Sequence, residues 1–153
     1  MQSLATIGYQ GATPDSFLRA LRSAGVELLV DIRAVASSRR PGFSKTKLAA
    51  SVGEAEIDYL HMRALGTPAD GRAAARGGHH GEMRSIFLAH MATPEAQQAL
   101  DDLADIVRSG RRVALLCFEA DPAHCHRNIV AAMLAEKLPL EITHLVPEPD
   151  PLY

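Results

Sequence analysis

The chain has 153 residues, of which 47% are hydrophobic and 22% charged, with two cysteines and a formal net charge of −2. These values are those of one ordinary globular domain with a single core, and they exclude a largely disordered chain. The start of the sequence lacks a basic segment followed by a long apolar run, so we expect a cytoplasmic protein without a membrane segment. A reducing compartment would keep both cysteines as thiols.

Short apolar runs alternate with amphipathic segments in the first half of the chain. Residues 4–8 predict a strand, and Thr13 followed by Pro14 predicts a helix start, because Thr caps helices and Pro suits their first turn. A nearly continuous apolar run predicts a strand covered on both faces over residues 26–33. The pattern then predicts a polar loop, a helix and a short strand over residues 34–43, 45–55 and 57–62.

The second half continues in the same way after one irregular segment. Residues 63–81 have no convincing periodicity, so we expect a long mobile or functional loop that contains His79 and His80. Asp121 and Pro122 predict the start of a helix that runs to Leu138. The other predicted elements are two helices and two strands, over residues 82–91, 93–109, 112–118 and 141–146.

The alternation of strands and helices predicts the fold class. It is typical of a single three-layer α/β domain, in which helices flank a mostly parallel central sheet of about five strands. We expect this domain to span residues 1–146, with a proline-rich tail over residues 147–153.

Polar residues follow the predicted strands at their carboxyl ends, where ligands gather in open α/β sheets. They are Tyr9, Asp31, Arg33, His61 and Glu119. Asp31 and Glu119 are candidates for a general acid or base, but Asp31 could equally pair with Arg33 or cap a loop. Tyr9, Arg33 and His61 are candidate substrate contacts.

Two further candidates lie in the loop after the second strand. Ser38 and Arg39 occupy a segment suited to contacts, and Arg39 with Arg40 offers paired donors to a phosphate or carboxylate. Residues 33–84 hold nine Lys and Arg against five Asp and Glu, a local charge of +4. This basic region could steer an anionic substrate or be an ordinary solvated face.

The segment CFEADPAHCHRNIV, residues 117–130, contains both cysteines. A thiol in the first turn of a helix near positive charge is favoured as a thiolate, so Cys125 and His126 form a candidate catalytic pair and Arg127 a candidate substrate contact. The alternative is core packing, because Cys125, Ile129 and Met133 would share one helix face.

Some thiol chemistries do not fit this segment. Alanine stands six residues after each cysteine, where a phosphatase loop needs Arg, and the cysteines are eight apart rather than in a CxxC pair. The Cys and His residues also lack the paired spacing of zinc motifs, so no metal ion or cofactor is predicted.

We therefore expect a small enzyme that acts on an anionic substrate of the nucleotide or nucleic-acid class. Arg33, Arg39 and Arg127 would bind the negative charge, and Asp31 or Glu119 would move protons. The alternative is a non-catalytic module that binds nucleic acid or a partner protein. Its nucleic-acid form predicts steeply salt-dependent binding.

Four segments in order resemble the domain-of-unknown-function family 488 over nearly the whole chain. The matching residues are Thr6-Ile7-Gly8-Tyr9 with Phe17, then Asp31, Arg33, Ser38, Arg39 and Phe43, then Tyr59, His61, Leu65 and Gly66, and finally Cys117, Glu119, Cys125, His126 and Arg127. Ala36 stands where the family pattern often has proline. The resemblance implies an α/β domain with clustered polar motifs and supplies no reaction or substrate.

Overall fold

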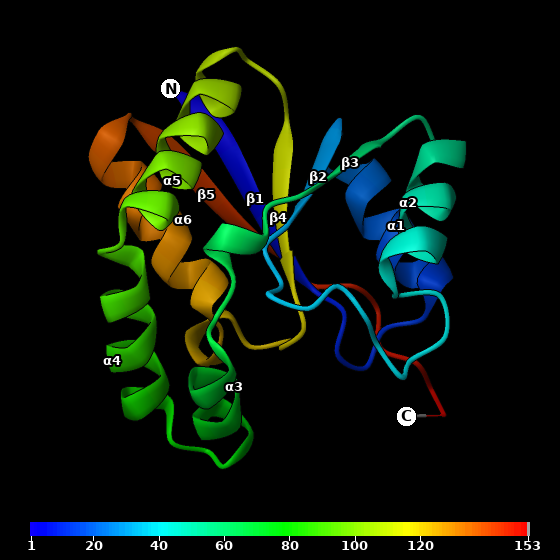
Figure 1. Cartoon of the computed structure of the whole chain (residues 1–153). Coiled ribbons are helices and arrows are strands. Elements are labelled where there is room, and N and C mark those ends of the chain that lie inside the picture. The colour runs from blue at the N-terminus through cyan, green and yellow to red at the C-terminus, as the bar shows by residue number, and fades with distance from the viewer. Residues whose placement is uncertain (153) are drawn as a thin grey trace.

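The computed structural model describes residues 1–152 as a five-stranded sheet with helices on both faces (Figure 1). All strand pairs are parallel, in the order β3-β2-β4-β1-β5. The strands are β1 (Gln2–Gly8), β2 (Leu28–Asp31), β3 (Asp58–His61), β4 (Val113–Cys117) and β5 (Leu140–Leu145). The predicted α/β class, parallel sheet and number of strands are confirmed.

Figure 1 shows how the helices divide between the two faces of the sheet. The first face carries α1 (Pro14–Ser23) and α2 (Lys45–Glu54). The opposite face carries α3 (Ala69–Arg76), α4 (His80–Met91), α5 (Pro94–Arg108) and α6 (His126–Lys137). None of these helices, within the part of the chain that is described, is both long and apolar enough to cross a bilayer.

The central strands are apolar on both sides because both of their faces are covered. Leu29 and Leu116 belong to the core under α1 and α2, whereas their neighbours Val30 and Leu115 belong to the core under α5 and α6. Successive side chains of a strand point to opposite faces, so one continuous apolar run serves two cores. This arrangement explains why β2 and β4 lack a polar–apolar alternation.

Helix α1 begins as predicted. The Thr13 hydroxyl accepts a hydrogen bond from the Ser16 backbone amide at 3.0 Å, and the Ser16 hydroxyl accepts one from the Thr13 backbone amide at 3.1 Å. Pro14 is the first helical residue. These contacts satisfy backbone donors that a helix start otherwise leaves open.

The absence of structure predicted over residues 63–81 is wrong. The segment contains a short 3₁₀ turn, Arg63–Leu65, the whole of α3 and, at His80, the first residue of α4. The buried face of α3 consists of Gly71 and Ala74, and α3 packs on α4. Because these residues are small, the helix has no apolar periodicity that the sequence could show.

The helix predicted to start at Pro122 is also shorter than expected. Pro122–His124 form only a 3₁₀ turn, capped by Asp121, and α6 starts at His126. Cys125 is the residue between them and has an extended backbone, with φ −131° and ψ 146°. It is therefore the N-cap of α6 rather than a member of its apolar face.

The end of the chain lies against the loop that follows β1. The Asp150 amide donates to the Gly11 carbonyl at 2.7 Å, and the Asp150 carboxylate pairs with Arg40 at 3.3 Å. Asp150, which belongs to the predicted tail, therefore contacts the loop between β1 and α1.

The chain leaves two neighbouring strands in opposite directions. After β1 it enters α1 on one face, and after β4 it enters α6 on the other, while β1 and β4 pair directly. Such a switch opens a crevice outside the carboxyl ends of the strands. The backbones at this crevice approach closely, because a Cβ on Gly8 would lie 1.9 Å from the Glu119 carbonyl oxygen.

We predict opposite effects for two glycine substitutions. Gly8→Ala would force the Glu119 carbonyl aside and lower the free energy of unfolding by roughly 1–3 kcal/mol. Gly53→Ala in α2 meets no atom within 4 Å, so it should raise that free energy by about 0.5–1 kcal/mol through helix propensity. Denaturant titration measures both, and equal effects of the two would contradict the close approach at Gly8.

Candidate functional site

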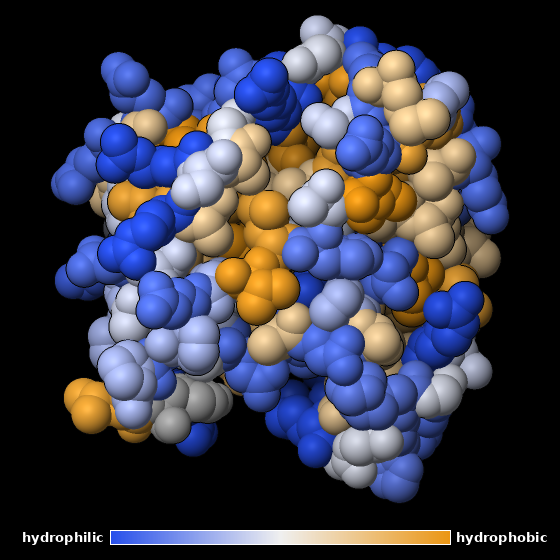
Figure 2. Space-filling view, turned by 180° about the vertical axis from the view of Figure 1, so that it is seen from behind, coloured by the Kyte–Doolittle hydropathy of each residue, from blue (hydrophilic) through white to orange (hydrophobic). Residues whose placement is uncertain are grey.

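A cavity of about 270 Å³ lies at the carboxyl ends of β1, β2 and β4. In Figure 2 the surface is notched at this edge of the sheet, between the two helical layers. Its wall includes an apolar part with Tyr9 and Phe118, and an ionisable part with Glu119 and His126. The position is the one that parallel α/β sheets use for ligands.

Asp31 and Arg33 form a buried ion pair at the end of β2. Both oxygens of the Asp31 carboxylate are engaged, at 2.9 Å from Arg33 Nε and 2.7 Å from Arg33 Nη2, and Asp31 has no exposed surface. The Tyr59 hydroxyl donates to the same carboxylate. Burial and this hydrogen bond raise the pKa of Tyr59 above its ordinary value.

The rest of Arg33 is also held in place. Its Nη1 donates to the Phe43 carbonyl at 2.7 Å and to the Tyr9 hydroxyl at 3.3 Å. Burial works against the charge, but the hydrogen bond and the attraction of Asp31 outweigh it and raise the pKa of Arg33. The guanidinium therefore stays charged and forms a fixed part of the cavity wall.

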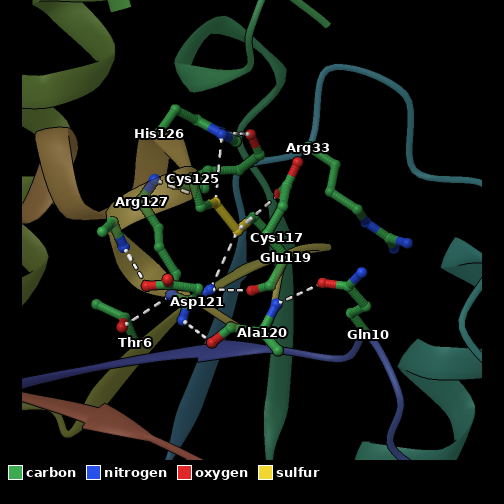
Figure 3. The surroundings of a disulfide bond; sticks show 12 residues. Thr6, Gln10, Arg33, Cys117, Glu119, Ala120, Asp121, Cys125, His126 and Arg127 are labelled. Carbon is green, nitrogen blue, oxygen red and sulfur yellow. Dashed lines mark hydrogen bonds between the residues drawn. A yellow bond between two sulfur atoms is a disulfide. The ribbon is translucent and has the colours of Figure 1, made fainter. Parts of the chain in front are cut away.

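Arg127 has no exposed surface and ties three segments together (Figure 3). It donates to the Glu119 carbonyl at 2.5 Å, to the Ala120 carbonyl at 3.2 Å and to the Thr6 hydroxyl at 3.0 Å. Burial lowers the pKa of Arg127 to about 10. The side chain fixes the loop after β4 on β1, so its position is behind the cavity rather than in it.

Cys117 and Cys125 form a disulfide between the end of β4 and the start of α6 (Figure 3). The prediction that both cysteines remain thiols is therefore wrong, and the eight-residue spacing does not prevent their pairing. The intervening loop turns back through its 3₁₀ turn and returns the chain to the strand end. The CxxC spacing rule does not cover two cysteines that a turn between them brings together.

The donor atoms of Cys117, Cys125 and His126 all lie within 4.8 Å of one another. Two thiolates and an imidazole suit a soft or borderline metal ion in the reduced protein. In the described structure the two sulfurs are bonded to each other instead.

Two ionisable groups at the cavity have shifted pKa values. Burial raises the pKa of Glu119, against the attraction of Arg127. Burial lowers the pKa of His126 to about 4, so its ring is neutral near pH 7. The ring donates from Nε2 to the Ile32 carbonyl at 2.7 Å, which leaves Nδ1 as an acceptor.

Three basic side chains of the cavity wall were missed by sequence reasoning: Arg72, Arg76 and His124. Arg72 and Arg76 are four residues apart on α3, so they share one helix face. This spacing was visible in the sequence, but it carries meaning only once a helix is recognised there. The His124 ring stacks on His80 with centroids 4.1 Å apart, so His80 is not in a loop as predicted.

The predicted site residues fall into three groups. Those that line the cavity are Tyr9, Arg33, Glu119 and His126, together with the disulfide partner Cys117. Asp31, Cys125 and Arg127 are buried directly behind this wall. Ser38, Arg39 and His61 are not part of the wall within residues 1–152; His61 Nε2 instead binds the Arg33 carbonyl at 2.7 Å.

A larger hollow of about 620 Å³ lies along α1 and β5. Its charged side chains stand at an exposed rim, where Arg19 faces Glu148 at 3.7 Å, and its floor is formed by small and apolar side chains. Buried ionisable groups mark functional sites more often than exposed ones do. The smaller cavity is therefore the candidate site.

We predict that Asp31→Asn lowers the free energy of unfolding by about 3–5 kcal/mol, because it leaves a buried guanidinium without its carboxylate. Asp58→Asn is the matched control, since Asp58 pairs with Arg111 at 2.6 Å on the exposed surface and should contribute less than about 1 kcal/mol. Urea titration compares the two, and equal losses would contradict the role of the buried pair.

Stability should also depend on pH through His126. Its pKa is about 4 when folded against 6.5 when unfolded, so the unfolded chain binds the proton first and stability falls as pH drops from 6.5 to 4. The loss should reach about 3 kcal/mol. In a plot of the free energy of unfolding against pH, His126→Gln should remove the decrease between pH 6.5 and 4. His79→Gln should retain it, because His79 is exposed.

Residues 13–134 match the family model described as "Domain of unknown function DUF488". No curated protein matches the chain. The match covers most of the α/β domain and includes every residue of the cavity wall except Tyr9. The chain belongs to the DUF488 family.

Proposed function

We propose that the protein is an enzyme that binds a small anionic substrate in the cavity at the carboxyl ends of β1, β2 and β4. One observation carries the proposal: Arg33, Arg72 and Arg76 line the same cavity as Glu119. Cationic donors bind an anion, and a carboxylate with a raised pKa can transfer a proton.

The size of the cavity favours a small ligand. At about 270 Å³ it is near the lower end of the range for ligand pockets. A phosphate, a carboxylate or part of a nucleotide would fit, whereas a nucleic acid could insert only a terminal group. Within the predicted anionic class we therefore favour a small molecule, acting in the cytoplasm.

The residues have different roles in this proposal. Arg72 and Arg76 on α3 bind the charge of the substrate, and Arg33 presents a further cationic edge. Asp31 is a positioning residue, because it holds Arg33 through two hydrogen bonds and has no exposed surface. Glu119 is the candidate acid or base, because burial raises its pKa toward neutrality.

We predict that the double variant Arg72→Gln with Arg76→Gln binds pyrophosphate at least about tenfold more weakly than the wild type. A hydrogen bond to a charged group contributes about 1.5–3 kcal/mol, which corresponds to tenfold or more in affinity. Isothermal titration calorimetry at fixed ionic strength measures the affinity, with nucleotides and dicarboxylates as further probes.

Arg84→Gln is the matched control, because Arg84 is an exposed arginine of α4 outside the cavity wall. Its affinity should equal that of the wild type. Equal losses in both variants, or tight binding to duplex or single-stranded nucleic acid with a steep salt dependence, would contradict the proposal and favour a nucleic-acid-binding module.

A further inference from the structure

The disulfide lies in the cavity wall, and its two sulfurs are placed differently. Cys117 is part of the wall, whereas Cys125 is buried behind it. A thiol that enters the cavity would therefore meet the Cys117 sulfur first. Since Cys117 has only 1% of its surface exposed, the cavity would select which thiols reach it.

Each sulfur has a donor that would stabilise a thiolate. The Arg127 backbone amide, in the first turn of the twelve-residue helix α6, donates to Cys125 Sγ at 3.4 Å. The Arg127 guanidinium lies 3.4 Å from Cys117 Sγ. A helix start and a neighbouring guanidinium both favour a thiolate over a thiol. Both contacts would strengthen on reduction, because a thiolate carries a negative charge that a disulfide sulfur lacks.

Proton acceptors lie next to both sulfurs as well (Figure 3). A carboxylate oxygen of Glu119 is 3.7 Å from Cys117 Sγ, and His126 Nδ1 is 3.7 Å from Cys125 Sγ. Because Nε2 of His126 donates to the Ile32 carbonyl, Nδ1 is free to accept a proton or hydrogen bond from a thiol. The surroundings thus serve the dithiol form as well as the disulfide.

We propose that Cys117 and Cys125 are a redox-active pair that exchanges with a small anionic thiol held by Arg72 and Arg76. This inference rests on the anion site of the proposed function and names its substrate class. In a reducing compartment, the disulfides that proteins do form are usually transient and have a catalytic or redox-sensing role.

The exchange proceeds in two steps. The thiolate of the first anionic thiol attacks Cys117 Sγ, so a mixed disulfide forms, the Cys117–Cys125 bond breaks and Cys125 leaves as a thiolate. A second molecule of the same thiol attacks the substrate sulfur of the mixed disulfide and releases Cys117. Two thiols are oxidised to one disulfide, and the protein disulfide is reduced to a dithiol by the same two electrons.

The experiment compares three thiols of similar size: mercaptopropionate, which is anionic, mercaptoethanol, which is neutral, and cysteamine, which is cationic. The folded, oxidised protein is reduced at matched thiolate concentrations, and alkylation with mass spectrometry follows the thiols formed. We expect mercaptopropionate to react at least tenfold faster than cysteamine. The Arg72→Gln with Arg76→Gln variant should lose this preference, and Arg84→Gln should retain it.

Single cysteine variants test the direction of attack. Cys125→Ser should trap mercaptopropionate as a mixed disulfide on Cys117 after incubation with the corresponding disulfide reagent, and Cys117→Ser should react at least tenfold more slowly at Cys125. The inference is overturned if no disulfide forms in the folded protein, if it is reduced only after denaturation, or if the reduced protein holds one tightly bound zinc ion that blocks exchange.

The outcomes separate this inference from the proposed function. Pyrophosphate binding that is lost in the double arginine variant, together with equal reaction of all three thiols, would overturn the thiol assignment and leave the anion site standing. Absence of pyrophosphate binding together with equal thiol rates would overturn both.

Discussion

The guanidinium of Arg127 is buried among neutral acceptors at the carboxyl end of the sheet, and the site is arranged around it. Every N–H group of a buried guanidinium needs a hydrogen-bond acceptor, because each unpaired donor costs free energy. Arg127 meets this need with the carbonyls of Glu119 and Ala120 and the hydroxyl of Thr6. Those contacts hold the loop after β4 close to β1, and Gly8 makes room for the approach.

Arg33 is also a buried guanidinium, but it is paired with a carboxylate instead of neutral acceptors. This difference explains why the two arginines have different roles at the site. Arg33 is neutralised by the Asp31 carboxylate, and the pKa of this guanidinium rises, whereas burial among neutral acceptors lowers the pKa of Arg127 to about 10. Arg33 can therefore present a rigid cationic edge to the cavity. Arg127 acts on the loop and on the two sulfurs instead.

Strong local patterns made much of this fold predictable. The apolar runs of β2 and β4, and the cap at Thr13, depend on neighbours in sequence and were recognised. Helix α3 was missed because its buried face is only Gly71 and Ala74, so Arg72 and Arg76 were missed with it. The disulfide depends on a turn that brings residues eight apart together, which no spacing rule encodes. Whether Arg127 would face a substrate or the interior likewise depended on tertiary packing.

The central claim is that ligands bind at the carboxyl ends of β1, β2 and β4 and not in the larger hollow along α1 and β5. Amide and guanidinium NMR shifts of the oxidised protein, followed during titration with a small anion, test it most directly. We expect the perturbed signals to cluster on α3, on the Arg72 and Arg76 side chains and on the loop between β4 and α6. Perturbations centred on Arg19, Arg112 and the end of β5 would contradict it.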